Sequence, residues 1–254
     1  MPSSESAALH QALEAVYERL YAGFEGARFE RRGDLIFALL PGVPIPQCNG
    51  AWVSEDSVDA ADTLADVVAE VEAAGEWPWV QTRSGQERGR RAAVALGLTH
   101  EERVPAMLVL PGEVIETDAA VEIELIAESE IAETNALLAA SFEAPVELFS
   151  RFSGAVHAMP EARWYVGRSG GAIVSTALGF TCEGSTGVFN VATPSEHRGR
   201  GHGAALTARV LRDGFEAGSE FGYLQSSAIG HGVYRRLGFR DVDEYTLSTR
   251  PPQG

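Results

Sequence analysis

Apolar residues recur along the chain in two kinds of spacing, and these predict an alternation of helices and strands. Apolar positions three or four residues apart predict helices over residues 9–21, 59–74, 85–96, 130–142, 201–217 and 229–237. Apolar runs and alternations predict a strand, turn and strand over 27–40, and single strands over 77–82, 104–110, 121–127, 164–166, 172–180, 187–192, 221–225 and 244–249. Helices that lie between strands predict a mixed α/β fold.

The last predicted helix carries one residue that the core pattern does not explain. Ile229, Val233 and Leu237 follow a spacing of four, which predicts a buried stripe. Tyr234 lies about 100° around the helix from Val233, so we expect its ring at the edge of the core. A phenol in that place could donate a proton to a leaving group.

The pattern breaks once, near the middle of the chain. Pro111 and Gly112 are followed by an acidic stretch that reaches Ala119. A chain of 254 residues is long enough for two domains of ordinary size. We therefore expect a first domain over residues 1–115 and a second over 120–254.

The charge of the chain restricts its partners. It has 36 Asp and Glu residues against 20 basic ones and a formal net charge of −16, which opposes binding to nucleic acids or anionic membranes and favours cationic small molecules. No apolar stretch is long enough for a membrane helix. Only two cysteines occur, and the N-terminus lacks the pattern of a signal peptide, so a cytoplasmic location is expected.

One segment, from Val188 to Ala204, combines an apolar strand, a glycine-rich turn and the start of a helix. Glycines let successive backbone N–H groups point into one concavity, and a helix N-terminus adds positive partial charge, so the turn is expected to bind a phosphate group. Its glycines do not have the G-x-G-x-x-G spacing of a dinucleotide fold. The chain also has no lysine, which excludes a P-loop.

The stretch from Arg198 to Gly203 matches the R/Q-x-x-G-x-G/A signature that binds pyrophosphate in the GCN5-related N-acetyltransferases (GNAT family). About 30 residues later, the segment from Leu224 to Phe239 resembles the strand, helix and Tyr-x-x-x-Gly-Phe pattern of the same family. The resemblance covers roughly residues 121–250. It implies a mixed, mostly antiparallel sheet flanked by helices.

The resemblance also implies a reaction, the direct transfer of an acetyl group from acetyl-CoA to a primary amine. Tyr234 would protonate the sulfur of the coenzyme, and the Val191 N–H would polarise the thioester carbonyl. A bulged strand over residues 189–193 would pair with the pantetheine arm. The residues expected to bind acetyl-CoA are Asn190, Val191, Thr193, Arg198, Gly199, Arg200, Gly201, His202, Gly203, Ala204, Ser227 and Tyr234.

The sequence departs from the family pattern at two of these positions. His202 stands where an aliphatic residue is common, and Ser227 stands where an asparagine often contacts the coenzyme arm. Binding through main-chain amides would survive both changes, although the Ser227 contact is the weaker of the two expectations.

Proton removal from the amine requires a base, for which Glu183 is the first candidate. Glu143 and His157 are alternatives. His197 and His231 flank the two motifs without a spacing that favours a metal, so no metal site is expected.

The first half of the chain echoes the second only at residues 85–98. This stretch ends in Leu-Gly-Leu where the later one ends in Leu-Gly-Phe, and it has neither the glycine turn nor the tyrosine. We therefore expect a smaller, degenerate GNAT-like domain over residues 1–115. The acceptor would be a small-molecule or peptide amine, and the protein a monomer or homodimer. The alternative is a non-catalytic acyl-CoA-binding protein or sensor.

Overall fold

A computed structural model describes residues 3–43, 46–57 and 60–251. The chain forms two compact units. The first contains Tyr17–Pro105 and the segment from Asp243 onward, and the second contains Ser3–Val16 and Ala106–Val242. These units differ from the two expected domains, 1–115 and 120–254, at both ends of the chain, because helix α1 (Ser4–Ala22) begins in the second unit and the C-terminal residues return to the first.

The first unit is built on a sheet with the strand order β1-β2-β3-β4-β11. Leu64, Val67, Val68 and Val71 are buried on one side of α2, as their spacing predicts, and pack against β2 and β3. The start of the predicted helix, Asp59, lies outside the described residues. The elements are β1 (Arg28–Arg32), β2 (Leu35–Leu39), the 3-10 turn η1 (Pro46–Cys48), β3 (Gly50–Val53), α2 (Ala60–Ala73), β4 (Trp79–Arg83) and α3 (Glu87–Ala95).

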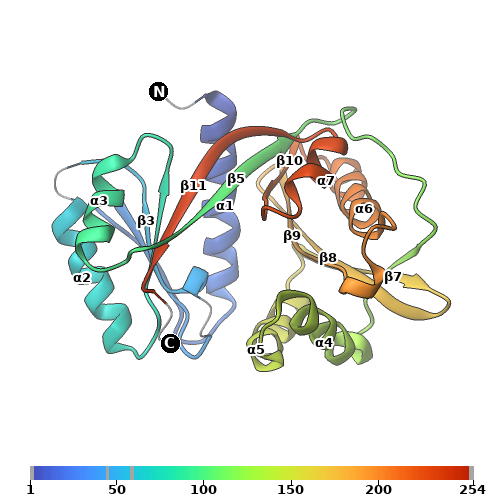
Figure 1. The fold of residues 1–254 in the computed structure, drawn as a ribbon, viewed down its shortest axis with the longest axis horizontal. Helices are drawn as coiled ribbons and strands as arrows, with labels where there is room; N and C mark the ends of the chain where they lie inside the picture. Colours follow the sequence, from blue (N-terminus) through green and yellow to red (C-terminus); the bar gives the residue numbers. More distant parts are fainter. Residues whose placement is uncertain (1–2, 44–45, 58–59, 252–254) are drawn as a thin grey trace. The chain divides into compact units, whose positions relative to one another are not determined.

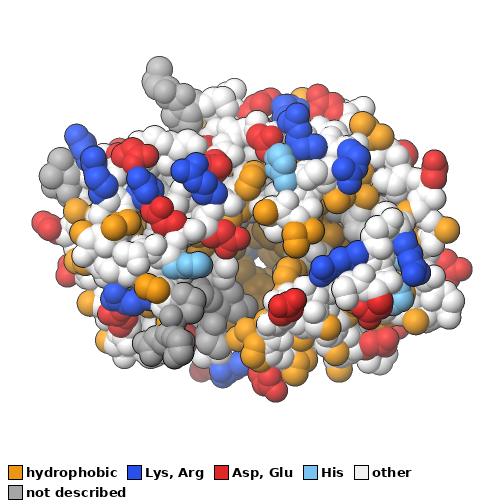
Figure 2. Space-filling view, in the orientation of Figure 1, with side chains coloured by type: hydrophobic (Ala, Val, Ile, Leu, Met, Phe, Trp, Pro, Cys, Tyr) orange, Lys and Arg blue, Asp and Glu red, His pale blue; other side chains and the backbone are white. Residues whose placement is uncertain are grey.

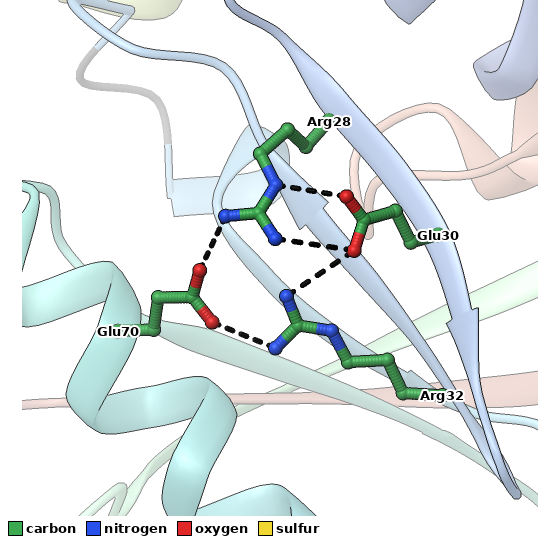
Figure 3. A network of polar contacts seen from close by, with 4 residues as sticks. All are labelled: Arg28, Glu30, Arg32 and Glu70. Carbon is green, nitrogen blue, oxygen red and sulfur yellow. Dashed lines mark hydrogen bonds and ion pairs between the residues drawn. The ribbon is translucent and has the colours of Figure 1, made fainter.

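A network of four charged side chains fastens the edge strand of this sheet to its helix (Figure 3). Arg28, Glu30 and Arg32 lie on β1, and both arginines also reach Glu70 of α2. The Arg32 guanidinium lies 3.9 Å above the ring of Phe37. These carboxylates hold the pKa of Arg32 above its ordinary value, with Glu70 as the larger influence. Each charge of the network has an opposite partner, so we assign it a structural role.

The second unit has the strand order β5-β10-β9-β8-β7-β6, in which only β9 and β10 are parallel. Helices α4 and α5 lie on one side of this sheet, and α6 lies on the other (Figure 1). The elements are β6 (Glu122–Leu125), η2 (Glu128–Glu130), α4 (Ile131–Phe142), α5 (Val146–His157), β7 (Ala162–Ser169), β8 (Ala172–Cys182), β9 (Ser185–Ala192), η3 (Ser195–His197), α6 (His202–Glu216), β10 (Phe221–Gln225) and α7 (His231–Arg236).

Two long strands, β5 (His100–Val109) and β11 (Arg240–Thr249), begin in one unit and end in the other. In the second unit, residues 106–109 of β5 pair antiparallel with β10. In the first unit, residues 245–249 of β11 pair antiparallel with β4. Each unit therefore completes its sheet with a strand from the other half of the sequence.

The predicted fold class, a mixed and mostly antiparallel sheet flanked by helices, is confirmed. One detail of the prediction is wrong. Helix α7 begins at His231, and Ile229 is 81% exposed because it lies in the turn before the helix. Leu237 is buried, as predicted. Helix α5 was not among the predicted elements.

Candidate active site

The candidate site begins at an irregularity in strand β9. Thr176 of β8 pairs with Ala192, and Leu178 pairs with Phe189, so the single residue Ala177 stands opposite both Asn190 and Val191. This is a β-bulge, and Asn190 adopts the left-handed conformation with φ of 48°. Asparagine tolerates that conformation better than most residues. The bulged strand that the family resemblance implied is therefore present.

Next to the bulge, β9 parts from its parallel neighbour. Only the first three residues of β9, Ser185 to Gly187, pair with β10. The remainder of β9, which includes the bulge, has no register with β10. Backbone groups along this edge are therefore free to bind an extended ligand in the manner of an added strand.

The turn after β9 is shaped by its glycines. Gly199 and Gly201 have φ of 77° and 80°, a conformation that strains other residues. Gly201 caps the start of α6, and a Cβ atom on Gly203 would lie 3.3 Å from Val191 Cγ1 and 3.7 Å from Thr193 Oγ1. The first turn of α6 is thus packed closely against the end of β9. Its free N–H groups and the helix dipole make this a site for an anion.

Two exposed arginines supply positive charge to the turn. Arg198 donates from Nε to the Thr193 carbonyl at 2.8 Å and from Nη2 to the Ser141 carbonyl at 3.3 Å. Arg200 donates to the Glu196 carbonyl at 3.3 Å. Because both arginines bind carbonyl groups here, their full charge remains available to a phosphate.

His202 is buried directly after the cap of α6, with 4% of its surface exposed. Its Nδ1 atom has no hydrogen-bond partner among the described residues. Burial, with smaller effects from Arg200 and His197, lowers the pKa of His202 below its ordinary value. The imidazole is therefore neutral at pH 7 and fills the place of the aliphatic residue that the family pattern favours.

Tyr234 lies in the middle of α7, the helix that follows β10. Its ring meets Phe239 edge to face with centroids 5.8 Å apart. Burial raises the pKa of Tyr234 to about 12, so the phenol keeps its proton at neutral pH. A Cβ atom on Gly230 would approach both Tyr234 Cε2, at 2.8 Å, and Ser227 Oγ, at 3.3 Å. Ser227 Oγ and the Tyr234 ring therefore both lie close to the same point beside Gly230.

The structure brings most of the predicted residues to one end of the parallel pair β9 and β10. Val191, Ala204 and Tyr234 all pack against the same hydrophobic core of the second unit. The same end of β9 carries Asn190, and the chain then continues through Thr193 into the turn from Arg198 to Gly203.

Glu183 is the exception among the predicted residues. It lies exposed in the tight turn between β8 and β9, at the opposite end of β9 from the bulge. At about 3.3 Å per residue, the strand separates Glu183 from Asn190 by roughly 20 Å. The structure therefore does not place Glu183 with the other predicted residues. It instead adds Ser141, whose carbonyl Arg198 binds, and no sequence pattern marks a contact through a backbone carbonyl.

Other classes of site find no support in the part of the chain that the structure describes. No cluster of three or more His, Cys, Asp or Glu side chains there could hold a metal ion. Within the same residues, no helix combines the length and the apolar character needed to cross a bilayer. Cys48 and Cys182 are not joined in a disulfide.

Comparisons with known proteins agree with this geometry. A sequence model of the acetyltransferase (GNAT) domain matches residues 122–242. The structure of a GCN5-related N-acetyltransferase from Kribbella flavida is similar over 95% of both chains, with a TM-score of 0.72 and 22% identity. One from Sphaerobacter thermophilus is similar over 93% of this chain and 86% of its own, with a TM-score of 0.63 and 16% identity.

A conserved protein of unknown function from Staphylococcus epidermidis also shares the fold, with a TM-score of 0.67 and 11% identity over 90% of this chain and 96% of its own. No curated protein matches the sequence. The structural likenesses establish the fold of the chain, and the domain match establishes the family of its second half. Residues 122–242 therefore form an acetyltransferase domain of the GNAT family.

Proposed function

We propose that this protein transfers the acetyl group of acetyl-CoA directly to the amine of a small molecule or peptide. The observation that carries the proposal is the open, bulged edge of β9, which runs into an anion-binding turn at the start of α6. An extended chain that ends in a pyrophosphate, as coenzyme A does, matches both features at once.

The coenzyme would be held mainly by the backbone. The amides from Arg198 to Ala204 would bind the pyrophosphate, and Arg198 and Arg200 would add charge. The unpaired edge of β9 from Asn190 to Thr193 would pair with the pantetheine arm. The Ser227 hydroxyl accepts a hydrogen bond from the Gly230 N–H and can still donate its own proton to the arm.

The proposed reaction uses two groups of this chain, the Val191 N–H and the Tyr234 hydroxyl. The Val191 N–H would donate to the thioester oxygen, which polarises the carbonyl. The amine nitrogen forms a bond to the carbonyl carbon, and the carbon–sulfur bond breaks. Tyr234 would give its proton to the departing sulfur, which leaves as the free thiol. The partly buried and protonated phenol is suited to this task.

The amine must also lose a proton. Because Glu183 lies at the far end of β9, we assign this step to Glu143. It follows α4 two residues after Ser141, the residue whose carbonyl Arg198 binds. The product of the complete step is an N-acetylated amine with coenzyme A as the leaving thiol.

The proposal is tested by calorimetry with acetyl-CoA, desulfo-CoA and NAD on the wild type and on Gly201→Glu. The variant places a side chain and a negative charge in the turn, so we expect acetyl-CoA affinity to fall at least about 100-fold. Gly170→Glu is the control, because Gly170 also has positive φ but lies in the β7–β8 hairpin. Nothing lies within 4 Å of a Cβ atom there, whereas at Gly201 that atom would lie 3.2 Å from Ala119 Cβ. It should bind acetyl-CoA as the wild type does.

Two results would count against the proposal. A folded wild type that does not bind acetyl-CoA would mean that the turn has only a structural role. Binding without release of thiol in the presence of any amine would favour the alternative, a non-catalytic acyl-CoA-binding protein or sensor.

A further inference from the structure

We propose that the acceptor is an amine joined to an aromatic or aliphatic body, and that the corner between α4 and α5 binds both parts. This α4–α5 corner consists of the apolar residues Phe142, Val146 and Phe149 and the acidic residues Glu143 and Glu147. The inference rests on the proposed function, because it names the substrate class of that same site.

The α4–α5 corner exposes apolar side chains to solvent, which is unfavourable in a loop without a ligand. Phe142 is 49% exposed and Val146 38%. Among the described residues, Phe142 is the one aromatic residue whose side chain is exposed. Its ring stacks on Phe149 with centroids 6.0 Å apart and an angle of 23° between the planes. Hydrophobic and acidic side chains gather over α4 and α5 in Figure 2. A flat aromatic surface of this kind favours another ring or an alkyl chain.

A direct hydrogen bond places this corner beside the coenzyme turn. The Arg198 guanidinium donates both to the Thr193 carbonyl at the end of β9 and to the Ser141 carbonyl in the last turn of α4. Phe142 is the next residue after Ser141. The exposed ring is therefore held close to the site where the coenzyme is proposed to lie.

Glu143 occupies a backbone position that other helices of this chain give to glycine. It caps the C-terminus of α4 with φ of 53°. The corresponding left-handed residues after α2, α3, α6 and α7 are Gly75, Gly97, Gly218 and Gly238. A left-handed residue with a Cβ atom costs about 1 kcal/mol relative to glycine. This strained position at the α4–α5 corner places a carboxylate next to Phe142 in the chain.

The charges of the corner suit an ammonium group. Glu143 is exposed, and Glu147 is exposed in the first turn of α5. Two carboxylates beside an aromatic face attract a cation both by charge and by the ring quadrupole. Carboxylates next to apolar surface therefore match a molecule with an amine at one end and an apolar body at the other. Three apolar side chains are too few for a stable protein interface, which needs about 800 Å² on each partner.

Steady-state release of thiol with two amines tests the inference. The amines are 2-phenylethylamine and ethanolamine, which both carry a primary amine on two carbons and differ in the group at the other end. We expect the wild type to favour 2-phenylethylamine at least tenfold in kcat/KM. Phe142→Ser should reduce that preference at least fivefold, because kcat/KM should fall more for 2-phenylethylamine than for ethanolamine. Leu125→Ser is the matched control, because Leu125 is a similarly exposed apolar residue on the edge strand β6 and should leave the preference as it is.

Glu143→Gly separates the role of the carboxylate from that of the backbone. Glycine relieves the left-handed strain, so the free energy of unfolding should stay the same or rise. At the same time, kcat/KM should fall at least tenfold for both amines. A residue that only shapes the turn would show the first effect without the second.

Each contrary result has a distinct meaning. Equal use of the two amines by the wild type would overturn the inference and leave the acetyltransferase intact. The inference would also be overturned if Phe142→Ser, like Leu125→Ser, left the preference for 2-phenylethylamine unchanged. A protein that binds acetyl-CoA but releases no thiol with either amine or with a wider set of amines would remove the proposed function, and the inference would fall with it.

Discussion

The two halves of the chain repeat one connection of strands and helices, and only the second half carries the candidate active site. In the first half, β3 leads through α2 to a parallel strand, β4, which is followed by α3. In the second half, β9 leads through α6 to a parallel strand, β10, which is followed by α7. In both, the second parallel strand then pairs antiparallel with a strand from the other half of the sequence.

The ends of the two short helices agree in their hydrogen bonds. The Leu98 N–H binds the Ala93 carbonyl at 3.0 Å, and the Phe239 N–H binds the Tyr234 carbonyl at 3.1 Å. The intervening Gly97 and Gly238 both have positive φ. Ala93 therefore occupies in the first half the position that Tyr234 occupies in the second. The match supports our proposal that the first half is a degenerate GNAT-like domain.

The parallel pairs differ most clearly. Both pairs have three residues in register, Gly50–Trp52 in β3 and Ser185–Gly187 in β9. Strand β3 ends one residue later, at Val53, whereas β9 continues for five more residues, to Ala192. At the end of β3, the side chain of Gln86 donates hydrogen bonds to the carbonyls of Val53 and Ser54 at 2.9 and 3.2 Å. These two carbonyls are thus satisfied within the protein.

The comparison teaches that a small set of changes divides a structural unit from a candidate site. A bulge opens the strand pair, glycines shape the turn, and a phenol replaces an alanine. The sheet and the helix positions are common to both halves. Four substitutions test this contrast.

Gly50→Ala should destabilise the first unit most, by about 3 kcal/mol, because overpacking of this kind has no route to relax. A Cβ atom on Gly50 would lie 1.8 Å from the backbone oxygen of Trp79. Urea denaturation measures the effect. Gly154→Ala is the control, since that site in α5 has no neighbour within 4 Å, and a gain of up to about 1 kcal/mol is expected there. If Gly50→Ala were tolerated equally well, the closed pair would be able to open, and the contrast would be broken.

Tyr234→Phe should lower kcat about 100-fold while acetyl-CoA affinity is unchanged, because the ring stays and the proton donor is lost. Tyr165→Phe is the control, since its hydroxyl binds Asp213 at 2.7 Å and its loss should affect stability alone. Equal rates for Tyr234→Phe and the wild type would remove the phenol from the mechanism.

The pH dependence of Tyr234 follows from its pKa. Burial raises this pKa from 10.0 to about 12, so the folded state favours the neutral phenol. Its contribution to stability is therefore complete below pH 10 and is lost as the pH rises towards 12. The rate should show no loss from ionisation of Tyr234 below pH 10.

Asp56→Ala should cost about 1 kcal/mol of stability and leave acetyl-CoA binding unchanged. The Asp56 carboxylate accepts hydrogen bonds from the N–H groups of Arg88 and Gly89 at 3.2 and 2.8 Å, at the start of α3. Glu55→Ala removes the same charge from the neighbouring exposed residue and should have no such cost. Weaker acetyl-CoA binding in Asp56→Ala would show that the first half takes part in binding the coenzyme.

His202→Leu should have the smallest effect, a change of less than about threefold in acetyl-CoA affinity, because the donors in the turn are backbone amides. The free energy of unfolding of His202→Leu should depend less on pH than that of the wild type. The pKa of His202 is lowered in the folded state, so in the wild type stability is lost as the pH falls below the ordinary value of 6.5. Thermal unfolding at pH 7 and pH 5 measures this difference, and His100→Leu, at an exposed position, is the control.

Elements with a local signal were predictable from the sequence. Glycine spacing predicted the turn before α6, and apolar spacing predicted the buried side of α2. Helix α5 also has such a signal, because Phe149, Phe152 and Val156 stand three and four residues apart, but it was not predicted.

Features that depend on distant parts of the chain could not be predicted in the same way. Glu183 was placed near the site because it is close to β9 in sequence, whereas the strand carries it away from the bulge. The exchange of β5 and β11 depends on pairings between residues more than a hundred positions apart, and no periodicity within a strand encodes its partner.

The exchanged strands also bear on how such a protein could arise and be divided. A gene cut within the segment 111–120 would give two fragments, and each would lack the strand that its sheet takes from the other. Neither fragment could be moved by recombination into a new protein without leaving an open sheet edge that invites aggregation. The half without the site therefore supplies a strand that the sheet of the other half needs.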